Sequence, residues 1–160
     1  MMDATLSSVL SGHLQSGSTL LLESGAGFLS HCEFALHQRM LHQYFDITIE
    51  RPVDLWWRAE YDALRKPRLA AHSRNECSNC QAVPYVHYQW PREVRVRDFS
   101  RAIPVSATSG NAVGRIGDLR VAWKMRVGKG MLIFLGSPMG PALRAGDSDA
   151  RAWLHSATEL

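Results

Sequence analysis

Glu23 and Ser24 are the residues of this sequence that best fit a catalytic site at the end of a strand. They lie in Thr19–Phe28 (TLLLESGAGF), where an apolar run enters a turn of small residues. α/β proteins build sites in this way at the carboxyl edge of a sheet. Ser24 could be an activated nucleophile. We favour the alternative, a serine that caps a glycine turn, because Glu-Ser-Gly-Ala-Gly is not Gly-x-Ser-x-Gly. Glu23 could be a buried carboxylate, but we favour a strand-end residue that faces solvent.

The stretch Met131–Gly140 (MLIFLGSPMG) repeats this plan late in the chain. Its continuously apolar part predicts a central strand, and its loop is small and rigid. We expect the two turns to meet at one edge of the sheet and to border one crevice. The residues predicted to bind a ligand in that crevice are Gly25, Gly27, Ser137 and Gly140.

Cys77 and Cys80 form a Cys-x-x-Cys pair, with His72 before it and His87 after it. Two thiolates and two imidazoles make the tetrahedral ligand set that zinc accepts, so a zinc-stabilised domain is one hypothesis. The second ligand pair that a zinc finger carries is missing. The favoured interpretation is therefore two loop thiols without a shared role. We expect no cofactor, with zinc as the alternative.

Basic residues gather on one predicted strand region, close to two aromatic residues. Such a set could hold an anionic or nucleic-acid ligand, but Glu93 and Asp98 dilute its positive field. Charged residues on an exposed strand also prevent edge pairing. The net charge of +3 and the pI of about 9.0 lie far from a dedicated nucleic-acid binder. We interpret the region as a solvated face and expect no nucleic-acid partner; its basic residues are Arg92, Arg95, Arg97 and Arg101.

The bulk composition is that of an ordinary globular protein. The chain has 160 residues, of which 46% are hydrophobic and 21% charged, enough for one domain over residues 1–160 with its own core. No apolar run is long enough to span a bilayer, and the first residues lack the pattern of a secretory signal. Three cysteines without disulfide-like spacing favour a reducing compartment. We expect a cytoplasmic protein without a membrane partner.

Periodicity predicts the elements that must position these residues. Helices are expected over Asp3–Gln15, after the capping box of Ser30 and Glu33, over Val53–Lys66, and after the N-cap Asp147. In the second helix the histidines, His37 among them, are expected mostly on the side away from the core. Residues 67–83 are expected to form an irregular loop. Strands are expected over 18–23, as a buried central strand, and over 47–50, 85–90, 93–99 and 103–106, followed by an antiparallel meander over 112–135.

Two regions resemble the class I glutamine amidotransferase-like superfamily. The first is His13–Gly17 (HLQSG) followed by TLLLESGAG. The second is Val121-Ala122, then Val127–Gly130 (VGKG), then Ile133–Gly136 (IFLG). In style both are similar to the non-amidotransferase branches, namely the trehalose-utilisation-protein-like and β-galactosidase trimerisation-type domains. Each motif is a strand–turn pattern rather than a catalytic signature.

The resemblance implies an open, mostly parallel α/β sheet flanked by helices, flavodoxin- or amidotransferase-like and shortened, with a C-terminal antiparallel meander. It also implies that the first strand and helix of the usual sheet are missing. An amidotransferase needs a cysteine in a Gly-x-Cys-x-Gly elbow and a late His-x-Glu, and the sequence has neither. The resemblance therefore does not imply glutamine hydrolysis.

The expected function is that of a non-catalytic amidotransferase-like α/β domain. It would bind a protein partner, a second copy of itself or a small ligand. One alternative is a small hydrolase that acts at the crevice between the two turns. The other alternative is the zinc-stabilised domain centred on Cys77 and Cys80. On balance the sequence favours a binding domain over an enzyme.

Overall fold

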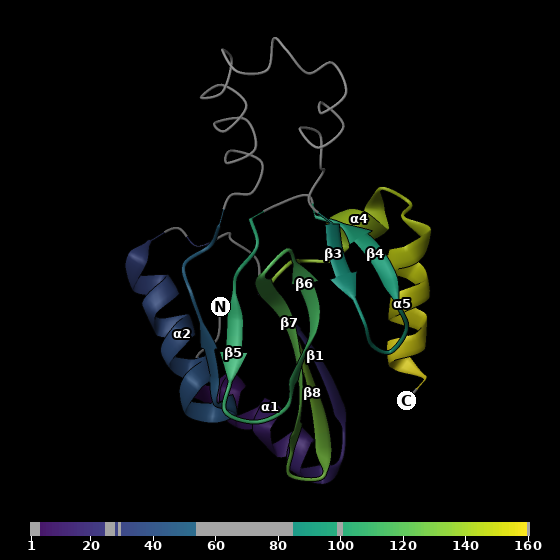
Figure 1. Cartoon of the computed structure of the whole chain (residues 1–160). Coiled ribbons are helices and arrows are strands. Elements are labelled where there is room, and N and C mark those ends of the chain that lie inside the picture. Colours follow the sequence, from purple (N-terminus) through teal and green to yellow (C-terminus); the bar gives the residue numbers. More distant parts are fainter. Residues whose placement is uncertain (1–3, 25–27, 29, 54–84, 99–100, 160) are drawn as a thin grey trace, which may run out of the picture.

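The computed structural model describes residues 4–24, 28, 30–53, 85–98 and 101–159 (Figure 1). Apart from Val53, the helix expected over Val53–Lys66 and the loop expected over 67–83 lie outside these residues. The single-domain organisation stays a prediction. Among the described residues, no helix combines the length and the apolar character that a membrane crossing needs.

The described helices are positioned by the caps that the sequence predicts. The hydroxyl of Ser30 accepts from the backbone N–H of Glu33 at 3.2 Å and begins the second helix. Asp147 begins the last helix, where its carboxylate accepts from the N–H groups of Asp149 and Ala150 at 2.9 and 3.1 Å. The helices are α1 (Ala4–Ser16), α2 (His31–Phe45), α4 (Gly140–Arg144) and α5 (Ser148–Thr158).

The strands form one sheet of six and one of two. The larger sheet has the order β1-β8-β7-β6-β3-β4, and the smaller one pairs β2 with β5. In the larger sheet the strands are β1 (Thr19–Glu23), β3 (Tyr85–Tyr88), β4 (Val94–Arg97), β6 (Asn111–Ile116), β7 (Leu119–Val127) and β8 (Gly130–Leu135). In the smaller sheet they are β2 (Ile47–Ile49) and β5 (Val105–Ala107).

The expectation of a mostly parallel sheet is wrong. Among the described pairs of the larger sheet, only β1 and β8 are parallel, and the others are antiparallel. The reason is connection length: short turns join β6 to β7 and β7 to β8, whereas a parallel neighbour needs a long crossover. The predicted meander is confirmed, and β8 lies inside the sheet between β1 and β7.

The expectation of a central position for β1 is also wrong, because β1 is an edge strand of the larger sheet. Its leucines Leu20, Leu21 and Leu22 are partly buried, and Thr19 and Glu23 are exposed. Leu20 and Leu22 pack into the core on one face of the sheet, and Leu21 packs into the core on the other. A strand that is covered on both faces has a continuously apolar sequence even at an edge, which is why its position was misread.

Helices cover both faces of the larger sheet (Figure 1). α1 and α2 pack on one face together with the two-stranded sheet, around a core that includes Leu41, Phe134 and Leu132. α4 and α5 pack on the other face, where the fully buried Trp153 lies against the ring of Tyr88 with 4.9 Å between ring centroids. In α1 the expected apolar face is only partly used, since Leu14 is buried but Leu6 and Val9 are exposed.

Candidate functional site

The carboxyl ends of β1 and β8 lie side by side. The parallel register pairs Glu23 with Leu135, and the N–H of Ser24 donates to the carbonyl of Leu135 at 2.8 Å. One turn later, the N–H of Met139 donates to Oε1 of Glu23 at 2.9 Å. The two strands therefore end at one edge of the sheet, where the side chain of Glu23 holds the turn that follows β8.

Ser24 has a histidine partner that the sequence did not identify. Its Oγ lies 2.8 Å from Nε2 of His37, on α2, and both residues are buried. The expectation that His37 faces away from the core is wrong. The Phe28 ring lies 5.1 Å from the His37 ring between centroids, so aromatic packing replaces solvent on this side of α2. Helical spacing carries a signal that could have found it: His37 follows Phe34 by three residues and precedes Leu41 by four, which places it on the apolar face of α2, whereas the exposed His31 and His42 lie outside that face.

Burial dominates the chemistry of this Ser24–His37 pair. It lowers the pKa of His37 to about 4, so the imidazole is neutral at physiological pH. Its Nδ1 atom makes no hydrogen bond with any described residue. A neutral imidazole can accept the Ser24 proton, but here no described carboxylate orients the ring as the third member of a triad does. With Ser24 only 2% exposed, the pair is closed to a substrate in this conformation.

Ser137 belongs to a second buried polar pair. Its hydroxyl donates to Oδ1 of Asp98 at 2.6 Å, and both residues are buried. Burial, followed by the nearby carboxylates of Glu23 and Asp98, raises the pKa of Tyr88 well above its usual value. The Asp98–Ser137 hydrogen bond ties the turn after β8 to the end of β4. Ser137 is thus engaged inside the protein.

The other predicted ligand-binding residues are glycines. Gly140 begins α4, and open space surrounds the position of an added Cβ atom. Gly25 and Gly27 lie outside the described residues. A glycine that the prediction omitted, Gly136, matters more: a Cβ atom there would overlap the Ile103 carbonyl oxygen, and the N–H of Ile103 donates to the Gly136 carbonyl at 2.7 Å. Gly136 therefore sets where the turn after β8 begins.

The predicted zinc ligands are mostly beyond the described part of the chain. His72, Cys77 and Cys80 lie outside it, and His87 is exposed on β3. Within the described ranges, no three or more His, Cys, Asp or Glu side chains gather as a metal site requires. The zinc hypothesis stays a prediction.

The backbone of the arginine-rich strand has hydrogen-bond partners that the sequence did not predict. The backbone N–H groups of Arg95 and Arg97, on β4, donate to the carboxylates of Asp149 and Asp147 at 3.2 and 3.5 Å. The guanidinium of Arg95 lies over the Tyr85 ring, 4.9 Å from its centroid. These aspartates at the start of α5 occupy the free edge of β4.

The sequence matches no family model and no curated protein, whereas the structure matches parts of solved glycoside hydrolases. One is a β-galactosidase from Rahnella sp. R3, with a TM-score of 0.62 and 10% identity over 99% of this chain and 21% of that chain. A second is an exo-β-1,4-mannosidase from Opitutaceae bacterium strain TAV5, with a TM-score of 0.55 and 9% identity over 99% of this chain and 22% of that chain.

A third is a GH42 β-galactosidase from G. stearothermophilus, with a TM-score of 0.51 and 16% identity over 86% of this chain and 17% of that chain. Identities this low show a shared fold and nothing finer. The chain spans about a fifth of the length of these enzymes. Its fold is that of an α/β part of glycoside hydrolases, which agrees with the β-galactosidase-type branch of the resemblance seen in the sequence.

Proposed function

We propose that this chain is a non-catalytic α/β domain that binds a protein partner in a glycoside hydrolase assembly. The observation that carries the proposal is the pattern of coverage. The fold match includes 86–99% of this chain but only 17–22% of the matched enzymes. A domain of this size within a larger enzyme contributes contacts to the rest of that enzyme or to its copies. The β-galactosidase trimerisation-type resemblance in the sequence supports the same kind of role.

The carboxyl-edge site supports a binding role over catalysis. Glu23 is engaged by the N–H of Met139, and Ser137 is engaged by Asp98. Ser24 is buried against a histidine that no described carboxylate orients. The hydrogen bonds of Glu23, Ser24 and Ser137 are thus made within the protein and stabilise this edge.

Two measurements test the proposal. The purified chain should not hydrolyse nitrophenyl β-galactoside or nitrophenyl β-mannoside at a rate above that of a heat-denatured sample. Co-expressed with a glycoside hydrolase from the same genome that lacks such a domain, it should purify as a stoichiometric complex. Hydrolysis by the chain alone, or separate elution of the two proteins, would overturn the proposal.

The Ser24–His37 hydrogen bond favours a second candidate, a small esterase. Ser24 Oγ would attack an ester carbonyl while its proton passes to Nε2 of His37. The imidazolium would return that proton to the leaving alkoxide, and water would then hydrolyse the acyl-serine in the same way. Such a reaction requires a conformation in which Ser24 is accessible to the ester, because Ser24 is buried here.

The Ser24→Ala variant separates the two candidates. An esterase would lose hydrolysis of nitrophenyl acetate in this variant, with its circular dichroism spectrum unchanged. Ser137→Ala is the matched control, since Ser137 is also buried at this edge but has an aspartate partner. Equal rates for the wild type and both variants would eliminate the esterase.

A further inference from the structure

The outer edge of β1 is open within the described structure. β1 is the first strand in the order of the larger sheet and pairs only with β8 among the described strands. An open edge of an apolar strand is a template for pairing with another chain. The edge of β1 consists of Thr19, three consecutive leucines and Glu23.

The hydrogen bonds to β8 determine which backbone groups point outward. The carbonyl of Ser18 accepts from Met131, and the N–H of Ser24 donates to Leu135. In a parallel ladder these bonds alternate along the strand, so Leu20 and Leu22 also face β8. The N–H and C=O groups of Thr19, Leu21 and Glu23 therefore face outward.

We propose that β1 pairs antiparallel with β1 of a second copy of this chain, about a twofold axis through Leu21. This dimer proposal rests on the proposed function only because both treat the chain as a protein-binding domain. In this register Leu21 lies opposite Leu21 of the other copy, and Thr19 lies opposite Glu23. Each of these two kinds of pair exchanges both of its outward backbone hydrogen bonds, because in this register every outward-facing residue lies opposite another outward-facing residue. The order Thr-Leu-Leu-Leu-Glu is symmetric in polarity about its centre, as an isologous interface requires.

The side chains fit this arrangement on both faces of the joined sheet. On the α1 and α2 face, Leu20 meets Leu22 of the other copy in a non-hydrogen-bonded pair, where side chains are closest. On the α5 face, Leu21 of the other copy lies beside a groove of about 180 Å³. This groove is lined by Thr19, Leu21, Ile133, Ala157 and Thr158. Partly exposed leucines on both faces would become covered.

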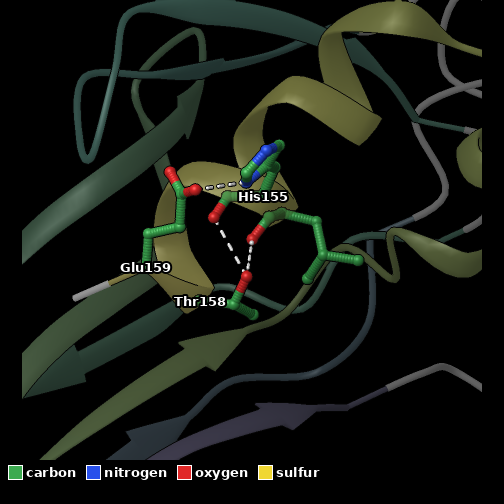
Figure 2. Close-up of polar contacts among 4 residues, drawn as sticks. His155, Thr158 and Glu159 are labelled. Atoms are coloured by element: carbon green, nitrogen blue, oxygen red, sulfur yellow. Dashed lines mark hydrogen bonds and ion pairs between the residues drawn. The ribbon is translucent and has the colours of Figure 1, made fainter.

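Thr158, which lines this groove, lies at the end of α5 (Figure 2). The Thr158 hydroxyl donates to the carbonyls of Leu154 and His155 at 3.1 and 2.9 Å. Nδ1 of His155 lies 3.2 Å from the carboxylate of Glu159. These contacts close the last turn of α5 internally and leave the groove beside β1 lined mainly by apolar side chains.

Charge favours the antiparallel register. Lys129 is exposed in the turn before β8, at the end of the sheet where β1 begins, and its Cβ atom lies near Gly17. The antiparallel register brings Glu23 of one copy to the Lys129 end of the other. A parallel register would instead place the two Glu23 carboxylates next to each other. The pairing also stops at two copies, because Asp147 and Asp149 occupy the β4 edge.

The first test uses the full chain in sedimentation velocity across a concentration series. The wild type should sediment as a dimer that dissociates on dilution. Thr19→Pro removes an outward N–H without touching the β8 ladder, and should weaken the dimer at least about tenfold. Thr19→Val is the matched control, which keeps the N–H and should remain dimeric. A wild-type monomer at all concentrations, or a trimer, would overturn the inference.

Hydrogen exchange supplies the second test and needs no variant. On dimerisation the amides of Thr19, Leu21 and Glu23 should exchange more slowly, whereas those of Leu20 and Leu22 should be protected in monomer and dimer alike. A dimer without this alternation would use another surface and would overturn the inference.

The charge prediction provides a second variant in case Thr19→Pro fails to fold. Lys129→Glu should weaken the dimer more than Lys129→Gln does, and the difference should shrink at high salt. Equal dissociation constants for the two would contradict the antiparallel register. Absence of a complex with a glycoside hydrolase would overturn the proposed function and leave these results standing, because they concern copies of this chain alone.

Discussion

The two edges of the six-stranded sheet differ in whether their outward backbone groups have hydrogen-bond partners among the described residues. At β4, the outward N–H groups of Arg95 and Arg97 donate to carboxylates from the start of α5. At β1, no described residue bonds the outward groups of Thr19, Leu21 and Glu23. β4 alternates valine with arginine, whereas β1 is apolar through its middle.

The comparison shows that an edge is closed by what packs beside it as well as by its own composition. β4 carries the charged residues that discourage pairing, and a helix also supplies acceptors for its N–H groups. β1 has neither device along its central leucines. The difference identifies β1 as the side of the sheet that is suited to a partner strand.

Trp153→Ala should have the largest effect on stability, because Trp153 holds α5 against the β4 side of the sheet. The side chain is fully buried, packs on Tyr88, and donates from Nε1 to the Trp90 carbonyl at 2.8 Å. We expect its loss to lower the free energy of unfolding by about 3–5 kcal/mol in urea titrations. The Trp153→Phe control should cost less, and a loss below about 1 kcal/mol for alanine would show that α5 is held by other contacts.

Titration of His37, which lies at the end of the open β1 edge, should give the next largest change in stability. Because burial lowers its pKa from 6.5 to about 4, the unfolded chain binds a proton that the folded chain excludes between these values. Stability should therefore be full above pH 6.5 and fall as the pH is lowered toward 4. Between pH 6.5 and pH 5 the loss should be roughly 2 kcal/mol, measured by urea unfolding at each pH.

The His37→Gln variant is the control for this pH dependence. It should be less stable than the wild type at pH 7.5, but its stability should change little between pH 6.5 and pH 5. If the stability of His37→Gln depended on pH as that of the wild type does, a group other than His37 would be responsible.

Substitution of Asp147 should give the smallest change in stability. It tests directly how the β4 edge is closed. Its carboxylate accepts from two N–H groups of α5 through Oδ1 and from Arg97 through Oδ2. Asp147→Ala loses the cap and the edge contact together and should cost about 1–2 kcal/mol in urea titrations. Asp147→Asn keeps a capping oxygen and should cost less. Equal costs for the two variants would show that the cap contributes nothing.

Local signals in the sequence were enough to predict most of the elements. The capping box of Ser30 and Glu33, the N-cap Asp147 and the meander before Leu135 depend on neighbouring residues, and all three are present. Short turns act over a few residues, so their sequence carries the information. The small-residue turns after both strands also predict that β1 and β8 end at one edge of the sheet, as they do.

The position of β1 and the partner of Ser24 could not be predicted in the same way. Whether an apolar strand is central or at an edge depends on which strands lie beside it, and periodicity records only which faces are covered. His37 has the helical spacing of the apolar face of α2, but its contact with Ser24 depends on how the helix packs against Phe28 and the end of β1. The acceptors at β4 come from the start of α5, 50 and 54 residues further along the chain.

The parallel pairing of β1 with β8 has a consequence for the order of folding. Thr19 and Met131 pair although they stand near opposite ends of the chain, whereas β6, β7 and β8 join through short turns. Closing short loops costs less chain entropy, so we expect the meander to form first and β1 to dock late. Pulse-labelled hydrogen exchange during refolding should protect β7 amides before those of Leu20 and Leu22. Until β1 arrives, the apolar β8 would itself be an unprotected edge, and refolding at high protein concentration should lose material to aggregation at this step.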